Sequence, residues 1–376
     1  MAGIYLHIPF CKTRCLYCDF FTGTDERAKD AFVAALCQEI LLRKDEVDEP
    51  VKTIYFGGGT PSRLSRKQLE QIIETLFKTF PITEKAEITL EANPDDLSLK
   101  YIEDLRLLPF NRISIGIQSF HDTELAFLSR RHTAQQAIET VKKCQDIGAF
   151  ENISIDLMYG LPGQTLDIWQ QNLLQALSLN IQHISAYHLI YEDKTPLTVL
   201  LKKGKIRPVS DELSTDMFSM LIDTLTSAGF EHYEIANFAR NQRYSRHNTS
   251  YWQGEKYVGL GPAAHSFDGK SRKWNVYSLS RYIEEMKKSQ LSSEIEILDI
   301  TTRYNEYILT GLRTQWGVDL SNLRKLFGEE LYRYCLENAE KYLTGHLLSI
   351  DQNTLMLTRE GIFISDGIMS DLMWVK

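Results

Sequence analysis

Three cysteines near the N-terminus form the group of residues best suited to chemistry. Cys11, Cys15 and Cys18 stand in a CxxxCxxC run. Thiolates are the usual ligands of iron–sulfur clusters, and three of them would leave one iron of a [4Fe–4S] cluster open. An open iron could chelate the amino and carboxylate groups of S-adenosylmethionine (SAM), a recognised carrier of radical chemistry. The spacing therefore predicts a [4Fe–4S] cluster that binds SAM.

A zinc site is the alternative for the same cysteines. Zinc prefers four nitrogen or sulfur ligands, commonly from two separated pairs. A fourth ligand here would have to be His7, which lies inside an expected strand. The other cysteines, Cys37, Cys144 and Cys335, fall in helical patterns and suit small core positions. Six cysteines distributed in this way favour a metal site in a reducing compartment over a disulfide framework.

Polar residues follow the cysteines at points that suit a bound SAM molecule. A GGGTP run provides glycines that let the backbone approach a ligand closely. Glu91 could bond to the amino group or ribose hydroxyls of SAM, Arg130 could pair with its carboxylate, and Asp156 could accept from its ribose. Each residue also fits a structural role, such as a tight turn or a helix cap. The expected SAM set is Gly58, Gly59, Thr60, Glu91, Gln118, Arg130 and Asp156.

These residues must be positioned by short β-branched runs that alternate with longer helical patterns. The alternation indicates a parallel sheet with helices outside it, and six units in series suit a partial (β/α)6 TIM-like barrel. A doubly wound sheet would give the same local signal. In both folds the chemistry lies at the carboxyl ends of the strands, where the cysteines and the polar set fall. Strands are expected at 4–8, 52–56, 87–91, 112–117, 153–158 and 183–188, and helices near 26–43, 66–79, 99–107, 134–147, 166–179 and 211–228.

The alternation stops after about residue 240. Residues 241–300 are rich in tyrosine, tryptophan, asparagine and glycine. From about residue 300 the pattern indicates helices, a strand pair around 347–357 and a last helix. We therefore predict a core barrel over 1–240 and a small α+β, winged-helix-like accessory domain over 241–376.

The composition argues against a nucleic-acid-binding, a membrane-spanning or a secreted protein. The 376 residues include 42 basic and 50 acidic side chains, a net charge of −8, so no basic surplus points to nucleic acid. No apolar run approaches the ~20 residues of a membrane-spanning helix. The N-terminus also lacks the basic start and apolar stretch of a signal peptide. We expect a cytoplasmic protein.

Six motifs spread almost end to end carry a family resemblance: YLHIPFCKTRCLYCDF, GGGTPS, EANP, RISIGIQSF, IDLMYGLPGQT and HNTSYW. With them the chain resembles the oxygen-independent coproporphyrinogen III oxidase-like branch of the radical SAM family. The resemblance implies that Cys11, Cys15 and Cys18 are the iron ligands. It also adds Tyr5 to the SAM residues and places Tyr17 near the adenine.

That branch contains the true coproporphyrinogen III dehydrogenases and the HemW-type heme chaperones. Phe20 stands where the dehydrogenases have a further cysteine, and Tyr5 begins the first strand without their N-terminal extension. The resemblance therefore implies a chaperone without dehydrogenase activity. It would transfer heme to acceptor hemoproteins, such as membrane-bound respiratory enzymes. Radical decarboxylation of coproporphyrinogen III is the alternative, radical chemistry on another substrate such as heme is a third, and a homodimer is left open.

The heme site implied by the resemblance is the HNxxYW motif, with His247, Asn248, Tyr251 and Trp252 in a polar, partly open loop. Neutral imidazole is a good axial ligand for heme iron, and the aromatic rings could pack on the porphyrin. The residue types alone favour a structural segment that anchors the loop to the barrel. His265 is a second candidate, either beside SAM or as a heme ligand.

Overall fold

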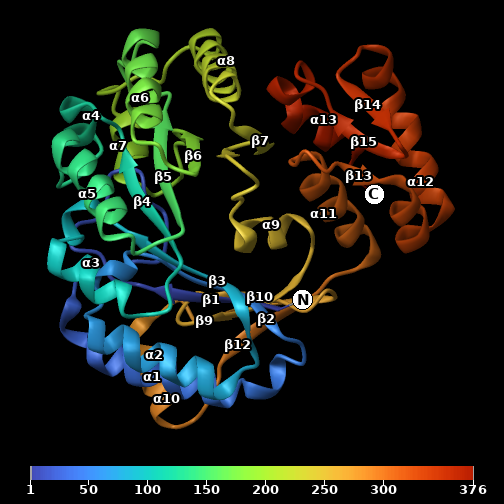
Figure 1. Cartoon of the computed structure of the whole chain (residues 1–376). Coiled ribbons are helices and arrows are strands. Elements are labelled where there is room, and N and C mark those ends of the chain that lie inside the picture. The colour runs from blue at the N-terminus through green and yellow to red at the C-terminus, as the bar shows by residue number, and fades with distance from the viewer. Residues whose placement is uncertain (1, 376) are drawn as a thin grey trace.

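Six parallel strands form the centre of the fold. They are β1 (Ala2–Ile8), β2 (Val51–Gly58), β3 (Ile82–Ala92), β4 (Arg112–Gln118), β5 (Asn152–Tyr159) and β6 (His183–His188). In the computed structural model, which describes residues 2–375, these strands lie side by side in chain order (Figure 1). A doubly wound sheet would reverse its order at a switch point. The uninterrupted order therefore confirms the partial (β/α)6 barrel.

The expected helices cover the outside of this sheet and end within a few residues of their predicted bounds. Local signals explain the agreement: Ser65 and Gln68 form a reciprocal capping box, and Gly148 ends its helix with a φ of 61°. Within residues 2–375, no helix combines the length and apolar character needed to span a bilayer. The helices are α1 (Lys29–Leu42), α2 (Arg66–Thr79), α3 (Leu99–Arg106), α5 (Ala134–Ile147), α6 (Leu166–Ser178) and α8 (Asp211–Ser227), with two shorter ones that we did not predict, α4 (Asp122–Phe127) and α7 (Pro196–Lys202).

The sheet continues beyond the six strands at both ends. Next to β1 lies β9 (Lys256–Leu260), also parallel, followed by the antiparallel strands β10 (His265–Phe267), β11 (Ser271–Asn275) and β12 (Ser293–Ile297). Beyond β6 lie β8 (Asn237–Ala239) and β7 (Glu231–Glu234). Residues 256–297 therefore belong to the barrel sheet, and the predicted boundary at residue 240 needs correction.

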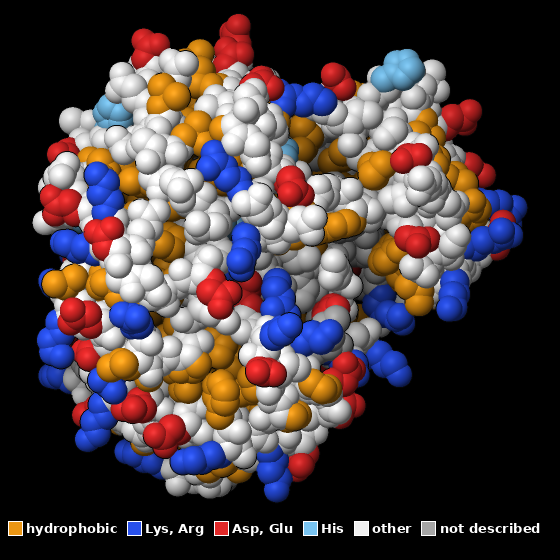
Figure 2. Space-filling view, in the orientation of Figure 1, with side chains coloured by type: hydrophobic (Ala, Val, Ile, Leu, Met, Phe, Trp, Pro, Cys, Tyr) orange, Lys and Arg blue, Asp and Glu red, His pale blue; other side chains and the backbone are white. Residues whose placement is uncertain are grey.

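A second hydrophobic core forms only after residue 300. It is built by α11 (Ile300–Leu312), β13 (Val318–Asp319), α12 (Leu320–Thr344), the hairpin β14 (Leu348–Asp351) and β15 (Thr354–Leu357), and α13 (Ser365–Leu372). This order of helices and hairpin is the winged-helix-like, α+β arrangement that we predicted. The unit sits beside the barrel body, and the surface is hollowed between the two (Figure 2). Acidic and basic side chains are interspersed over the face shown there.

A buried ion pair joins α1 to the sheet extension. Glu39 lies in the last turn of α1 and Arg43 caps the end of that helix; both are fully buried, with Nη1 of Arg43 3.2 Å from Oε1 of Glu39. The guanidinium also donates to a backbone carbonyl and a serine hydroxyl, and the carboxylate accepts from a backbone amide, an amide side chain and a phenol. These partners lie on or beside β9 to β11 and on α10 (Leu279–Lys287): Gly259, Gly261, Ser266, Asn275 and Tyr282.

Candidate functional site

A cavity of about 450 Å³ opens at the carboxyl ends of the barrel strands. It brings together residues that are far apart in the chain, as the barrel geometry requires. Tyr5 is not among them. The predicted residues on its wall are Cys11, Cys15, Tyr17, Cys18, Gly58, Gly59, Thr60, Glu91, Gln118, Arg130 and Asp156.

The three cysteines lie in the loop after β1 as free thiols. Thr60 donates from Oγ1 to Sγ of Cys11 at 3.4 Å, and Arg130 donates from Nη1 to Sγ of Cys15 at 3.3 Å. In the described chain, no three His, Cys, Asp or Glu side chains converge on a point that could hold a single metal ion. The cysteines of a cubane bind different irons and need no such convergence. Three thiols on one cavity wall, with donors beside two of them, therefore fit an iron–sulfur cluster.

Two carboxylates lie deep in the cavity. Tyr55 donates from its hydroxyl to Oε1 of Glu91 at 2.7 Å, and Ser114 donates to Oδ1 of Asp156 at 3.1 Å. Removal from water, with a smaller contribution from the nearby Asp156, raises the pKa of Glu91 to about 7, although the Tyr55 hydroxyl and Arg112 act in the opposite direction. The pKa of Asp156 is raised by burial as well. A ligand that donates hydrogen bonds or brings positive charge would favour the ionised form of both groups.

Arg130 and Gln118 are held in fixed positions on the same wall. The Arg130 guanidinium donates to Oδ1 of Asn93 at 2.5 Å and to the carbonyl of Gly116. Gln118 ends β4 with a φ of 72°, a left-handed conformation that is uncommon for a residue other than glycine. Strain of this kind persists where the surroundings demand it, often at functional sites. The backbone at Gln118 thus turns its side chain to the cavity.

The glycines at the end of β2 allow close packing inside the barrel as well as close approach of a ligand to the backbone. Gly58 has a φ of 104°, and a Cβ there would lie 2.6 Å from the ring of His7. Tyr5 lies inside the barrel, where its hydroxyl is 3.2 Å from Nδ1 of His7 and its ring stacks on Tyr55 at a centroid distance of 6.2 Å. Tyr5 therefore supports the site from behind, and its predicted contact with SAM is not seen in the cavity lining.

His247 does not lie in an open loop. It is fully buried on α9 (Arg246–Trp252), with Nδ1 2.8 Å from Oγ1 of Thr53 and Nε2 2.7 Å from the hydroxyl of Tyr251. Burial lowers the pKa of His247 to about 3, so the ring is neutral. The prediction of an open, accessible ligand was wrong, because polar partners inside the barrel satisfy both ring nitrogens. An axial role for His247 stays a prediction that this conformation does not support.

The rest of the HNxxYW motif is also engaged in packing. The backbone N–H of Asn248 donates to the Ser245 side chain at 3.5 Å, Tyr251 packs edge-on against Tyr257 and Trp252 lies under the Arg313 guanidinium, 5.0 Å from the ring centroid. These contacts correspond to the structural alternative for the motif. The second candidate, His265, lies on β10 with Nε2 3.0 Å from the hydroxyl of Tyr277, away from the cavity lining.

The mouth of the cavity carries apolar side chains that sequence reasoning missed as a group. Phe20 is 60% exposed and Ile190 is 64% exposed, and both line the cavity with Tyr187 and Leu189. Their position in the sequence could have identified Tyr187 and Ile190. Tyr187 lies at the carboxyl end of β6 and Ile190 just after it, at the same edge of the barrel as the predicted SAM residues. Exposed apolar groups gathered at one opening mark a binding surface. The cavity thus combines a polar floor with an apolar mouth.

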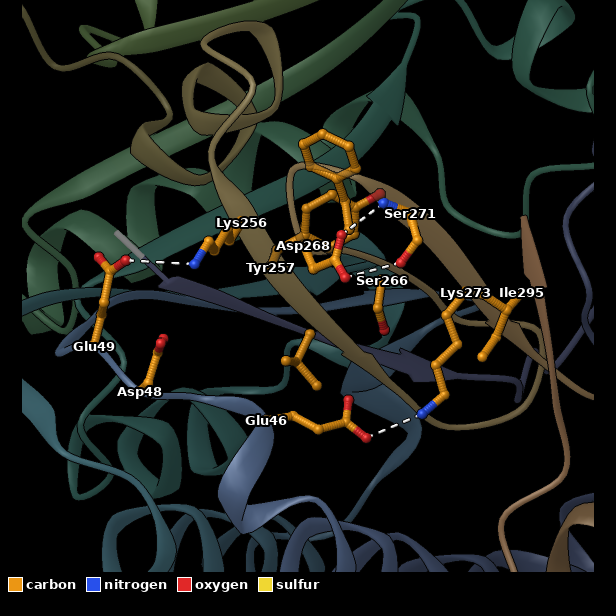
Figure 3. Close-up of a pocket in the computed structure, with 12 residues that line it drawn as sticks. Glu46, Asp48, Glu49, Lys256, Tyr257, Ser266, Asp268, Ser271, Lys273 and Ile295 are labelled. Carbon is orange, nitrogen blue, oxygen red and sulfur yellow. Dashed lines mark hydrogen bonds and ion pairs between the residues drawn. The ribbon is translucent and has the colours of Figure 1, made fainter. Parts of the chain in front are cut away.

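Another cavity, of about 320 Å³, lies between the end of α1 and strands β9 to β12 (Figure 3). Both lysines that line it are paired with glutamates. Lys273 is 3.0 Å from Glu46, and Lys256 is 3.9 Å from Glu49. Asp268 accepts from the backbone and side chain of Ser271. This internal pairing gives the cavity less capacity for ligand chemistry than the site at the strand ends.

Comparisons with known proteins agree with this geometry. Residues 5–173 match the radical SAM superfamily, and residues 298–364 match the HemN C-terminal domain. The chain is 33% identical to the heme chaperone HemW of Bacillus subtilis, over 98% of each protein. It is 31% identical to the mitochondrial radical S-adenosyl methionine domain-containing protein 1 of Danio rerio, over 99% of this chain and 87% of that protein.

The fold is also that of a solved structure. Coproporphyrinogen III oxidase (HemN) from Escherichia coli superposes with a TM-score of 0.85 over 99% of this chain and 90% of that one, at 22% identity. At this identity the likeness establishes a shared fold and leaves the chemistry to the site.

Proposed function

The chain belongs to the HemW family of radical SAM proteins, and from that membership we propose that it is a heme chaperone, which binds heme and transfers it to acceptor hemoproteins. The observation that carries the proposal is the 33% identity to HemW over 98% of both chains. The alternative, coproporphyrinogen III dehydrogenase, rests on the shared fold alone. By the family resemblance that activity goes with a cysteine at the position of Phe20, an exposed side chain at the cavity mouth.

Membership of the radical SAM superfamily implies a [4Fe–4S] cluster and SAM. We assign the cluster to Cys11, Cys15 and Cys18, and SAM to the polar floor of the cavity. When bound, the cluster supplies an electron for reductive cleavage of SAM. Arg130 provides positive charge beside Cys15, fixed by Asn93 and the Gly116 carbonyl.

We place heme at the apolar mouth, in preference to His247. A porphyrin needs an accessible apolar surface, and Phe20, Tyr187 and Ile190 offer one at the opening of the cavity. His247 offers a ring whose nitrogens are both occupied. A site at the mouth also leaves heme partly open to solvent, as release to an acceptor requires.

A titration of the anaerobically reconstituted protein with hemin, followed by absorbance, tests the proposal. The parent protein should bind hemin stoichiometrically. The Phe20→Ser/Ile190→Ser variant should bind it at least about tenfold more weakly, because each apolar side chain buried against the porphyrin contributes on the order of 1 kcal/mol. Leu107→Ser changes an equally exposed leucine outside the cavity lining and should bind like the parent.

A parent protein that binds no hemin would refute the chaperone function, and formation of protoporphyrinogen under anaerobic conditions would establish the dehydrogenase in its place. Equal hemin affinity in Phe20→Ser/Ile190→Ser and the parent would refute the site at the mouth while leaving the function intact.

SAM binding should depend on pH through Glu91. The pKa of this carboxyl is about 7 in the cofactor-free protein, and hydrogen bonds from the SAM amino group or ribose are stronger to the ionised form. Binding below pH 7 must therefore release a proton, and affinity should fall about tenfold between pH 8 and pH 6. Calorimetry of the reconstituted protein in two buffers of different ionisation enthalpy measures both the affinity and the proton release. Glu91→Gln should bind weakly with no such pH dependence, and an equal slope in that variant would assign the proton to another group.

A further inference from the structure

Aromatic rings are stacked through the barrel from α9 to the floor of the cavity. The His247 ring lies 5.1 Å from that of Tyr55, with 23° between their planes, and Tyr5 stacks on both. Tyr55 then donates its hydroxyl to Glu91 at 2.7 Å. Thr53, the partner of His247, lies near the start of β2, whereas Glu91 lies near the end of β3. The stack thus joins the amino-terminal end of the barrel to the proposed SAM site.

The His247 ring is held in one orientation. Thr53 and Tyr251 engage its two nitrogens from opposite sides. The backbone N–H groups of Arg246 and His247 donate to the Glu87 carboxylate at 3.1 and 3.0 Å, which fixes the start of α9 against β3. Gly3 leaves room for the ring, since a Cβ there would lie 3.3 Å from Cε1 of His247. The plane that Tyr55 stacks on is therefore rigid.

We propose that His247 is a positioning residue for the SAM site: its ring fixes Tyr55, and Tyr55 holds the Glu91 carboxylate. The proposal rests on the proposed binding of SAM at Glu91. It gives the buried HNxxYW segment a role in cofactor binding that does not need contact with heme.

The Tyr55 hydroxyl matters because it stabilises the ionised form of Glu91. Without that donor the carboxylate would be harder to form, and SAM would bind more weakly and with a midpoint at higher pH. Other groups act on Glu91 from the neighbouring elements, and neither Tyr55→Phe nor His247→Gln removes them. They are Tyr5 of β1, Arg112 of β4, Asp156 of β5, Tyr187 of β6 and Tyr251 of α9.

A double-mutant cycle between His247→Gln and Tyr55→Phe tests the coupling. Glutamine retains groups that can bond to Thr53 and Tyr251 but has no ring to stack on Tyr55. We expect each single variant to weaken SAM binding at least about tenfold, the effect of one hydrogen bond to a charged group, and to raise the pH midpoint. The double variant should bind SAM no more weakly than Tyr55→Phe alone, because His247 acts through Tyr55.

His183→Gln is the matched control. His183 is also a fully buried barrel histidine with both nitrogens engaged, by Ser154 and Tyr233 at 2.7 Å each, but its ring does not stack on Tyr55. Its effects on SAM binding should be small and should add to those of Tyr55→Phe. Additive effects of His247→Gln and Tyr55→Phe would overturn the proposal. The proposal would also be overturned if His247→Gln left the pH midpoint of SAM binding unchanged and abolished hemin binding.

A parent protein that binds no SAM would refute the proposed SAM site and leave the chaperone function to the hemin titration, and the coupling of His247 to Glu91 through Tyr55 would then be decided in the cofactor-free protein. Because the pKa of Glu91 is higher in the folded state than in the unfolded chain, its contribution to stability is full below pH 4.5 and is lost as pH rises to about 7. Urea unfolding across this pH range measures the contribution, and comparison with Glu91→Gln identifies the part that comes from Glu91. The pH at which this contribution is lost should be higher in His247→Gln and Tyr55→Phe than in the parent. Loss of this contribution at the same pH in His247→Gln and in the parent would overturn the inference.

Discussion

Replacing Cys15 with alanine should leave the protein unable to retain a [4Fe–4S] cluster. Three thiolates are the smallest set that can hold a cubane with one open iron, and Cys15 is one of three on the cavity wall. After anaerobic reconstitution with iron and sulfide, the parent should contain about four irons per chain and absorb broadly in the visible range. The variant should retain almost none of either after desalting, and SAM binding should be lost with the cluster.

Cys37→Ala is the control for this experiment. Cys37 is a partly buried thiol on α1, where it donates weakly to the Gln71 carbonyl, and it does not line the cavity. Its removal should leave the iron and sulfide content unchanged. Full cluster content in Cys15→Ala, or equal loss in Cys37→Ala, would contradict the assignment of the ligands.

Arg43→Met should destabilise the barrel by about 3–5 kcal/mol, the cost of removing one partner from a buried ion pair. The Glu39 carboxylate would be left without its cation in a place that water does not reach, and the Gly259 carbonyl and Ser266 would lose their donor. Urea unfolding followed by tryptophan fluorescence measures the change, since Trp169 lies in the same core.

Two further variants make this result specific. Lys78→Ala breaks an exposed pair with Glu74 on α2 and should change the free energy of unfolding by less than about 1 kcal/mol. Adding Glu39→Gln to Arg43→Met removes the stranded charge and should recover part of the loss. A cost for Arg43→Met as small as that of Lys78→Ala would show that the pair does not hold the extension to the barrel.

The sequence was most informative where structure is determined locally. Alternating patterns predicted the strand and helix bounds, and the structure shows the local end signals that produce them, such as the Ser65–Gln68 capping box and Gly148. The cavity residues followed from one rule, that parallel strands present their carboxyl ends at one edge. Glu91 and Asp156 therefore meet in one cavity although 65 residues separate them.

The features that were missed depend on contacts between distant segments. No local pattern shows that β9 will pair with β1, so the extension was assigned to the second domain. Nor does the polar composition of HNTSYW show burial, because its partners are polar groups inside the barrel, Thr53 and Glu87. Buried polar groups with satisfied hydrogen bonds cannot be told from exposed ones by residue type.

The pairing of β9 with β1 also has a consequence for synthesis on the ribosome. About 250 residues separate these neighbours, and at translation rates of about 5–20 residues per second the second strand follows the first by roughly 10–50 s. During that interval β1, which leads into the cysteine loop, has an unpaired edge, a surface that other chains can join. A nascent chain of this protein therefore spends tens of seconds with its cluster-bearing strand open on one side, and it is most exposed to misassembly before the extension is complete.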